Sequence, residues 1–269
     1  MQTKLAERVE RVRNDEEHGA SWLAKEAVEA VSEAAELGED PIELGRRLVE
    51  ARPAMGAIAG ALGRVLAAGK SPEQIVEEAQ ALVASRERAS KAIAVLIQPY
   101  VKGVVLTHSA SSTVREALLH TPPDRVVCTI SDPVGEGRGL AEDLRAAGLT
   151  VELVDDSDAE HAAATVNVVL LGADTVFLDG SLVNKLGTKG IAKAAKKAGV
   201  PVIVACEIIK LLPEDPWDPE DEERFDLTPA ESIDMYVTEE GMGPPEEIAA
   251  LIDRTPFLRE GYELLKSAS

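Results

Sequence analysis

Cysteine and aromatic residues are both scarce in this sequence. Only 3% of the residues are aromatic, so alanine, valine, leucine and isoleucine have to fill the core. The two cysteines, Cys128 and Cys206, lie inside the apolar segments VVCTI and IVACEI, without CxxC spacing. This pattern favours small buried core residues over reactive thiols, and it gives no support to a cysteine-ligated metal site.

Histidines are few, and long apolar segments are missing. No two histidines are spaced i, i+4, so we predict no metal site, and nothing in the sequence calls for a cofactor. We find no signal peptide and no apolar run long enough to cross a membrane. The expectation is a soluble, cytoplasmic protein without a membrane partner. The four histidines are His18, His108, His120 and His161.

Positive charge is in short supply as well. The chain has 28 lysines and arginines against 48 aspartates and glutamates, which gives a net charge of −20. Such a surface repels a phosphate backbone except at a local basic patch, so we expect no direct nucleic-acid partner. The acids are spread over the whole length, which favours a halophilic surface adapted to strong screening. A merely acidic cytosolic protein is the alternative.

The first hundred residues have a helical pattern. Asp40 and Pro41 have the residue types of an N-cap and a first helical position, and Ser71-Pro72-Glu73 repeats this start signal for a helix that runs to about residue 98. Another helix is expected over Met55–Ala68. These signals predict an all-helical domain over residues 1–100. One apolar stripe at helical spacing consists of Leu23, Ala27, Ala30, Val31, Ala34 and Ala35.

After Gly103 strands alternate with helices. This alternation implies right-handed crossovers and a mostly parallel sheet. We therefore predict an α/β protein, with an N-terminal helical bundle followed by a Rossmann-like domain over residues 101–269. The acidic segment Pro213–Asp226 is expected to be a solvated loop, with a mobile lid as the alternative. Strands are expected at 104–108, 125–130, 150–154, 175–178, 202–205 and 235–238, and helices at 113–119, 139–147, 159–168 and 189–198.

The stretch Leu170–Lys210 has the size of one βαβ unit. Its pattern predicts a strand, a polar turn, a helix capped by Thr188 and ended by Gly199, and a second strand that is buried on both faces. Ionisable and amide side chains gather near the strand ends, where open α/β sheets place ligands. These side chains belong to Asp174, Asp179, Asn184, Lys185, Glu207 and Lys210.

Three local patterns leave alternatives open. The hydroxyl-rich segment Thr107–Thr113 could hold an anion at a helix N-terminus, or it could simply cap that helix. Gly135–Gly139 superficially resembles a dinucleotide fingerprint, but its spacing and its neighbours Asp132 and Glu136 favour a flexible turn. Asp174 could be a general acid/base if burial raises its pKa, or it could be an ordinary turn aspartate.

Eight short segments occur in an order that resembles the initiation factor 2B alpha/beta/delta family. That family also contains isomerases acting on ribose 1,5-bisphosphate and on methylthioribose 1-phosphate. The resemblance covers nearly the whole chain, and the GAD…NKLGT block is its most specific part. The segments are HGAS (18–21), RPAMGAI (52–58), THSAS (107–111), GADTVFLDG (172–180), NKLGT (184–188), ACEIIK (205–210), FDLTP (225–229) and TEEG (238–241).

The resemblance implies an N-terminal helical domain, a C-terminal Rossmann-like domain and a homo-oligomer, either a dimer or a hexamer. It also implies a site for a sugar phosphate or a nucleoside monophosphate. The isomerases use a cysteine and an aspartate, and these catalytic positions fall on Ser109 and Asp174. The implied ligand-binding residues are Gly19, Ala20, Arg52, Ser111, Asn184, Lys185 and Lys210.

Three positions depart from the family pattern. Serine replaces the cysteine at position 109, and a hydroxyl is a far poorer nucleophile or acid than a thiol when no base stands beside it. Asp132 and His18 stand where the family has phosphate-side arginines, and an aspartate there repels a phosphate. We therefore predict a non-catalytic member that resembles a regulatory alpha subunit, senses a phosphorylated metabolite or contacts a translation factor. An aldose–ketose sugar-phosphate isomerase is the alternative.

Overall fold

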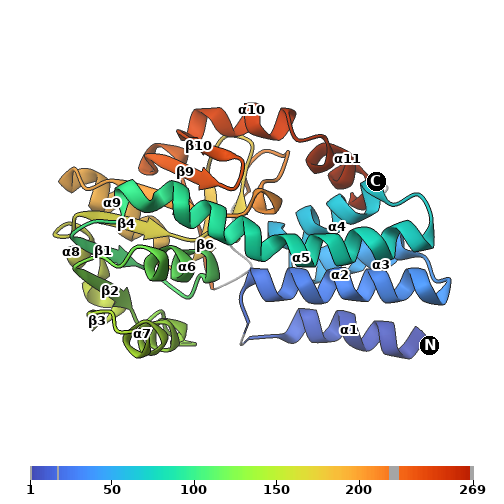
Figure 1. The fold of residues 1–269 in the computed structure, drawn as a ribbon, viewed down its shortest axis with the longest axis horizontal. Coiled ribbons are helices and arrows are strands. Elements are labelled where there is room, and N and C mark those ends of the chain that lie inside the picture. The colour runs from blue at the N-terminus through green and yellow to red at the C-terminus, as the bar shows by residue number, and fades with distance from the viewer. Residues whose placement is uncertain (1, 17, 218–223, 267–269) are drawn as a thin grey trace.

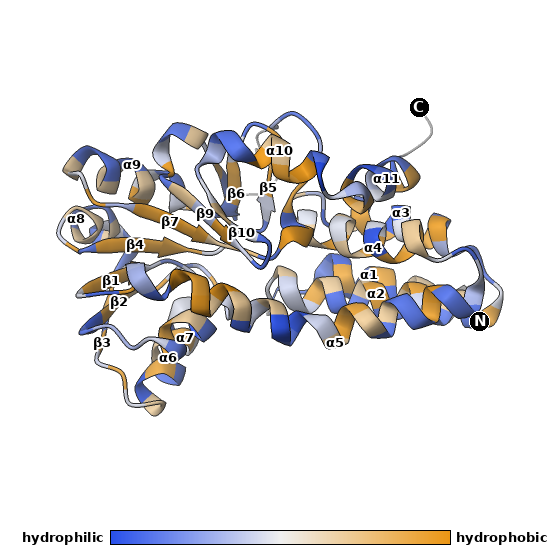
Figure 2. Cartoon of the chain, turned by 45° about the horizontal axis from the view of Figure 1, so that its top comes forward, coloured by the Kyte–Doolittle hydropathy of each residue, from blue (hydrophilic) through white to orange (hydrophobic). Residues whose placement is uncertain are grey.

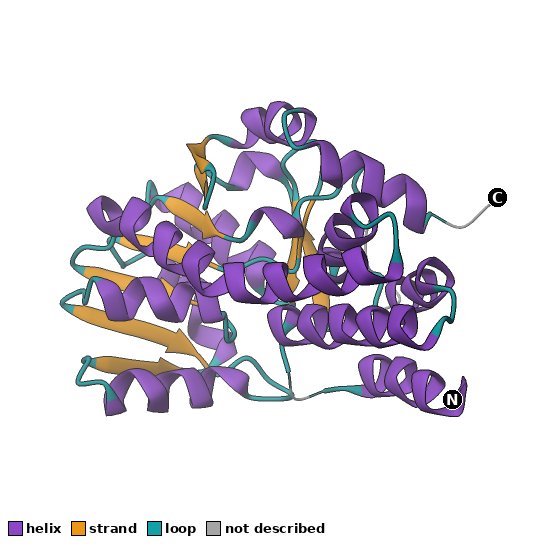
Figure 3. Ribbon diagram, turned by 45° about the vertical axis from the view of Figure 1, so that its right-hand side comes forward, coloured by secondary structure: helices purple, strands orange, loops and turns teal. Residues whose placement is uncertain are grey.

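The computed structural model describes residues 2–16, 18–217 and 224–266 (Figure 1). A group of N-terminal helices packs beside a twisted sheet that is flanked by further helices, which confirms the predicted α/β architecture. The long helix α5 (Pro72–Ile97) runs along both parts, as Figures 1 and 3 show. Because α5 contacts helices on one side and the sheet edge on the other, it ties the two parts together.

The N-terminal helices begin where the sequence signals predict. The Asp40 side chain accepts hydrogen bonds from the backbone N–H groups of Ile42 and Glu43, and Ser71 accepts one from Gln74. The predicted apolar stripe is buried in the bundle. The remaining helices of this part are α1 (Gln2–Asn14), α2 (Ala20–Leu37), α3 (Pro41–Ala51) and α4 (Gly56–Ala68).

The large sheet has seven strands in the order β10-β9-β7-β4-β1-β2-β3, and all neighbours are parallel except β10 and β9. Figure 2 shows its central strands as almost uniformly apolar, which is typical of strands covered on both faces. The strands are β1 (Val104–Thr107), β2 (Arg125–Thr129), β3 (Val151–Val154), β4 (Val168–Leu171), β7 (Val202–Ala205), β9 (Met235–Thr238) and β10 (Gly241–Gly243). The crossover helices are α6 (Ser112–His120), α7 (Glu136–Ala146), α8 (Ala159–Ala163) and α9 (Thr188–Ala198).

The predicted βαβ unit is only partly right. The expected polar turn contains a strand, β6 (Leu182–Lys185), which pairs antiparallel with β5 (Thr175–Val176) and β8 (Phe225–Thr228) in a separate small sheet. The large-sheet strand before α9 is therefore β4 and not residues 175–178. The predicted helix over 159–168 is wrong beyond Ala163, because a short apolar run does not reveal its own period.

Two predicted helix starts are also corrected. Residues 135–139 are not a flexible turn, because Gly135 caps α7 with φ 74° and the helix begins at Glu136. Gly187, with φ 103°, caps α9 in place of Thr188, whose hydroxyl donates instead to the Lys185 carbonyl. At the other end, Gly199 closes α9 in the left-handed conformation, as predicted.

The C-terminal helices return to the N-terminal ones. Helix α11 (Pro256–Leu265), which follows α10 (Ile248–Asp253), packs on α4 so closely that a Cβ on Gly261 would lie 2.2 Å from the Gly63 Cα. One cluster of buried apolar residues extends from α1 through the sheet to α11. The division into residues 1–100 and 101–269 stays a prediction, since the end of the chain contributes to both parts.

Three further expectations bear on the fold. Both cysteines are buried, and burial raises the pKa of each thiol to about 12, so they are core residues as predicted. Within the described ranges, no helix combines the length and apolarity that a membrane span requires. Much of the acidic segment Pro213–Asp226 lies outside the described residues, and its end forms the start of β8.

Candidate functional site

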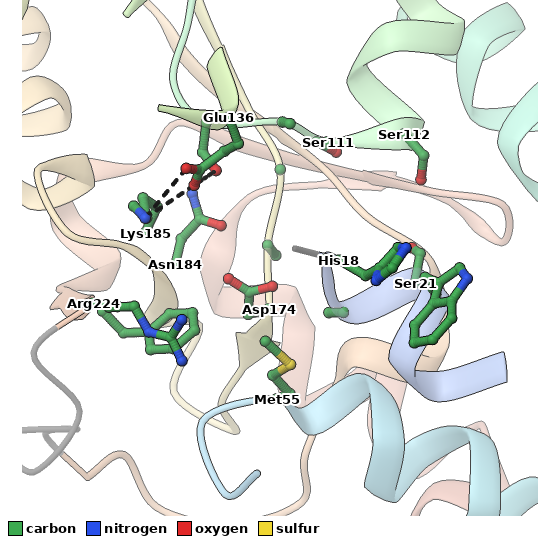
Figure 4. A pocket seen from close by; sticks show the side chains of 18 of the residues that line it. His18, Ser21, Met55, Ser111, Ser112, Glu136, Asp174, Asn184, Lys185 and Arg224 are labelled. Atoms are coloured by element: carbon green, nitrogen blue, oxygen red, sulfur yellow. Dashed lines mark hydrogen bonds and ion pairs between the residues drawn. The ribbon is translucent and has the colours of Figure 1, made fainter. Parts of the chain in front are cut away.

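A cavity of about 220 Å³ lies at the carboxyl ends of β1, β4 and β6, where α2 and α4 approach the sheet (Figure 4). All nine predicted site residues line it, although they come from six separate segments of the chain. Asp179 and Glu207, which the sequence grouped with them, do not. The nine are Gly19, Ala20, Arg52, Ser109, Ser111, Asp174, Asn184, Lys185 and Lys210.

Two helix N-termini meet at one end of this cavity. A Cβ on Gly19, the cap of α2, would lie 3.8 Å from the Ala110 carbonyl oxygen in the loop before α6. Ser111 caps α6 by accepting a hydrogen bond from Val114 N–H, so its hydroxyl has the capping role that the sequence left open. Gly172 lets the end of β4 lie close to the start of α6, since a Cβ at position 172 would lie 2.6 Å from Ser111 Oγ. The positive ends of two helix dipoles therefore face the same space.

The other end holds a charged cluster of Ser109, Glu136 and Lys185. The Ser109 hydroxyl donates to Glu136 Oε1 at 2.9 Å, and Lys185 Nζ lies 3.0 Å from the same oxygen. The side chain of Lys185 is only 7% exposed and that of Glu136 21%, so solvent screens this ion pair weakly. The expectation that no base stands beside Ser109 is therefore wrong.

Glu136 was missed because the segment around it was interpreted as a flexible turn. The first turn of α7 is instead held against the end of β2, where Gly137 N–H donates to the Ile130 carbonyl at 3.1 Å. A Cβ at position 137 would lie 1.8 Å from the Thr129 carbonyl oxygen, so only glycine fits. A carboxylate on a glycine-flanked helix start directly after a parallel strand was the available signal.

Ser109 has a strained backbone. Its φ is 64°, and Ser131 is the other non-glycine residue of the described chain with a positive φ, at 65°. This conformation costs a residue with a Cβ about 1–2 kcal/mol. Both are held by hydrogen bonds, since Ser109 N–H donates to Ser131 Oγ at 2.8 Å and Ser131 N–H donates to Asp156 Oδ1 at 2.8 Å. Strained positions of this kind cluster at functional sites.

Asp174 lies between the two ends of the cavity, and Asn184 lies beside Glu136 (Figure 4). The Asp174 backbone is fixed from both sides, since its N–H donates to the Val183 carbonyl at 3.0 Å and its carbonyl accepts from Ala57 N–H at 3.3 Å. The side chain of Asn184 is buried and donates to Thr188 Oγ1 at 3.1 Å. The small sheet and the start of α4 thus hold both residues against the cavity.

Besides Lys185, two buried cations contribute to the wall. Lys210 is 4% exposed and donates to the Ala173 carbonyl, and it forms no ion pair with a carboxylate of the described chain. The buried Arg52 donates to the backbone carbonyls of Val12 and Asp15, which fixes the segment between α1 and α2. A further cation on the lining, Arg224, was not predicted, because it follows the acidic segment and matches no motif.

The two expected arginine replacements differ in position. His18 does line the cavity; its ring stacks on Trp22 with centroids 3.8 Å apart, and its Nδ1 lies 2.8 Å from Asp15 Oδ2. Asp132 is exposed and is not part of the lining, and its N–H donates to Asp156 Oδ2 at 2.7 Å. The acidic group that faces the cavity from this region is Glu136.

A buried histidine supports the loop that carries Ser109. His108 Nε2 donates to the Leu186 carbonyl at 2.9 Å, and its Nδ1 lies 2.6 Å from Thr129 Oγ1. Burial lowers the pKa of His108, so the neutral ring is favoured. Over residues 2–16, 18–217 and 224–266 no group of three or more His, Cys, Asp and Glu side chains is arranged to hold a metal ion.

The fold and the cavity define a class of protein, in which a helical N-terminal part and a mostly parallel α/β sheet enclose a polar pocket at the strand ends. Residues 17–224 match the Initiation factor 2 subunit family, and the chain belongs to that family. This confirms the resemblance seen in the sequence.

Relatives in this family carry two kinds of name. Ribose 1,5-bisphosphate isomerase of Archaeoglobus fulgidus is 30% identical, over 90% of this chain and 90% of its own length. A Pyrococcus furiosus protein described as eIF-2B subunit 2-like is 33% identical, over 77% of this chain and 79% of its length. The crystal structure of translation initiation factor eIF-2B from Pyrococcus horikoshii superposes with a TM-score of 0.79 at 27% identity, covering 90% of this chain and 97% of that one.

Proposed function

We propose that this chain binds a small phosphorylated metabolite in the cavity and acts as a regulatory or sensing member of its family. The ligand is a sugar phosphate or a nucleoside monophosphate. A cavity of about 220 Å³ lies below the range of about 300–1,000 Å³ that is typical of drug-sized ligands, which favours such a small molecule.

The observation that carries the proposal is the uncompensated charge of Lys210. An ammonium group that is 4% exposed and forms no ion pair in the described chain is costly to bury, and an anionic ligand would offset that cost. The N-termini of α2 and α6 add positive potential to the same space. In a chain with a net charge of −20, such a pocket is a favourable place for an anion.

The serine at position 109 supports a binding role over turnover. Its hydroxyl is hydrogen-bonded to a carboxylate that already pairs with Lys185. The resemblance assigns a thiol to this position, and a thiol ionises far more readily than a hydroxyl. The strained backbone at position 109 therefore carries a hydroxyl where the resemblance implies a thiol, as expected for a site used for recognition.

Isothermal titration calorimetry tests this function. Ribose 5-phosphate and adenosine monophosphate are the probes, and we expect at least one to bind. Lys210→Met should weaken binding at least about tenfold, whereas Lys193→Met, the same change on the exposed face of α9, should not. Absence of heat with a panel of phosphomonoesters, at both low and high salt, would overturn the proposal.

An isomerase remains the second candidate, because two of the carboxylates that line the cavity, Glu136 and Asp174, belong to the sheet side of the site. Glu136 accepts the Ser109 hydroxyl, and Asp174 lies across the cavity from it (Figure 4). Together they could move protons in an aldose–ketose conversion. Turnover of ribose 1,5-bisphosphate by the purified protein, abolished by Asp174→Asn, would establish this function in place of the first.

The same proposal includes self-association and a cytoplasmic location. We expect a homodimer, with a hexamer as the larger form and a translation factor as a further partner, as the resemblance implies. Light scattering coupled to size-exclusion chromatography measures the mass directly. A monomer at all concentrations, with and without phosphomonoester, would contradict the homo-oligomer.

A further inference from the structure

The glutamate at one end of the cavity, Glu136, limits the kind of ligand that fits there. We infer that Glu136 makes the site selective for a ligand with a single phosphate, whose opposite end carries a hydroxyl or an amine. This inference rests on the proposed binding of a phosphorylated metabolite. It goes further by assigning the phosphate to one end of the cavity and by naming the residue that excludes a second phosphate.

Lys185 already forms an ion pair with Glu136, so its charge is not available to a phosphate. The Nζ atom lies 3.0 Å from Oε1 and 3.4 Å from Oε2, so it contacts both oxygens of the carboxylate. A phosphate brought to Lys185 would meet that carboxylate at short range, in a site where neither partner is well exposed. Like charges repel strongly where solvent screens weakly, so this end of the cavity disfavours a dianion.

The start of the helix that carries Glu136 is fixed in place. This helix starts from Gly135 in a left-handed conformation, and Gly137 is pressed against the Thr129 carbonyl. The carboxylate is also restrained by the Ser109 hydroxyl, whose own backbone is held by Ser131. The hydrogen bond from Ser109 and the ion pair with Lys185 therefore hold the negative charge in the cavity, on a helix start whose backbone is fixed (Figure 4).

The same carboxylate can recognise a hydrogen-bond donor, either neutral or positively charged. A carboxylate has about four lone-pair sites, and Oε1 already accepts from Ser109 and Lys185. Oε2, at 3.4 Å from Lys185, keeps acceptor capacity for a sugar hydroxyl or an ammonium group. The buried amide of Asn184 lies beside it and adds a second polar group to this end.

The opposite end is suited to the phosphate. The N-termini of helices α2 and α6 lie there, and His18 lines the wall. The buried Lys210, which forms no ion pair with a carboxylate of the described chain, donates to the carbonyl of Ala173. Asp15, whose carboxylate pairs with His18 Nδ1 at 2.8 Å, also lines this end, so the positive potential there comes from the two helix N-termini and from Lys210. It stands opposite the fixed carboxylate of Glu136 and gives the cavity a polarity. A pentose or hexose monophosphate, with its phosphate at the helix end and its hydroxyls at Glu136, matches that polarity.

Calorimetry with two probes that differ by one phosphate tests this selectivity. Wild-type protein should bind ribose 5-phosphate at least about tenfold more tightly than ribose 1,5-bisphosphate, and Glu136→Gln should shift this ratio at least about tenfold toward the bisphosphate. Glu142→Gln removes one negative charge from an exposed position of the same helix and should leave the ratio unchanged.

A double variant separates charge from shape. Glu136→Gln with Lys185→Gln removes the cation together with the anion, and we expect it to gain less bisphosphate affinity than Glu136→Gln alone. The ratio of the two affinities in the wild-type protein needs no variant, so it tests the selectivity for a single phosphate even where a variant is unstable. Equal affinities, or tighter bisphosphate binding by the wild type, would overturn the inference and leave the proposed function standing, whereas failure of both probes to bind would overturn the proposed function itself.

Discussion

The guanidinium of Arg86 holds the carboxylate of Glu207 through two hydrogen bonds, 2.9 Å from Nε to Oε2 and 2.7 Å from Nη2 to Oε1. Arg86 lies on α5, and Glu207 follows β7 and begins the turn that carries Lys210. The third nitrogen, Nη1, donates to the Ser21 carbonyl at the start of α2. One side chain thus joins the N-terminal helices to the wall of the cavity.

Breaking this pair should destabilise the protein strongly. The side chains of Arg86 and Glu207 are 16% and 4% exposed, so removing one partner leaves a charge with little solvation. We expect Arg86→Ala to lower the free energy of unfolding by about 3–5 kcal/mol, with Arg86→Lys intermediate because lysine lacks the paired geometry. Urea denaturation measures the loss. The exposed pair Lys91–Glu87 is the control, and a loss for Arg86→Ala no larger than for Lys91→Ala would contradict the expectation.

A methyl group at Gly60 should disrupt the contact between α4 and the turn that carries Lys210. The added Cβ would lie 1.9 Å from the Ile209 carbonyl oxygen, and neither backbone can move alone. Overpacking of this kind costs about 1–3 kcal/mol or more, so we expect Gly60→Ala to lower the melting temperature clearly. Gly139→Ala, also inside a helix but with open space around it, should be neutral or stabilising by up to about 1 kcal/mol. Equal effects of the two changes would show that α4 does not pack as described.

His108 should make stability depend on pH. Burial lowers its folded-state pKa below the ordinary value of 6.5, so below pH 6.5 the unfolded chain binds a proton that the folded protein does not. The contribution of the neutral His108 ring to the free energy of unfolding is therefore complete above pH 6.5. It is lost as the pH falls from 6.5 toward the lowered pKa of the folded protein, by at most about 1.4 kcal/mol per pH unit. Thermal melts at pH 7.5 and 5.5 should show a smaller pH effect for His108→Gln than for the wild type. The exposed His120→Gln serves as the control, and identical pH effects in all three proteins would refute the assignment.

The acidic surface should make folding depend on salt. With a net charge of −20, like-charge repulsion opposes the compact state, and its range falls from about 10 Å at 0.1 M salt to about 3 Å at 1 M. We expect the melting temperature to rise between about 0.1 M and about 3 M KCl, followed by far-UV circular dichroism. Near pH 4.5, where glutamates are partly protonated, the rise should shrink. A flat curve at neutral pH would refute the halophilic interpretation.

Elements with strong local signals were predicted correctly. The caps at Asp40 and Ser71, the glycine that ends α9 and the buried strand β7 agree with the structure, because short-range hydrogen bonds and burial on both faces leave direct traces in the sequence. The predictions failed where neighbours decide the conformation. Residues 182–185 look polar and turn-like, but they pair with β5 and β8 and form a strand.

By itself, the sequence determined the α/β class, the family and nine of the residues that line the cavity, since each depends on a local period or a local motif. Only the tertiary structure decided what stands beside Ser109. Glu136 is 27 residues away along the chain and Lys185 is 49 residues beyond Glu136, and no short-range rule relates them. They meet because α7 is pressed onto the end of β2 while β6 leaves the main sheet to pair elsewhere. That packing places a carboxylate where the sequence showed only a turn.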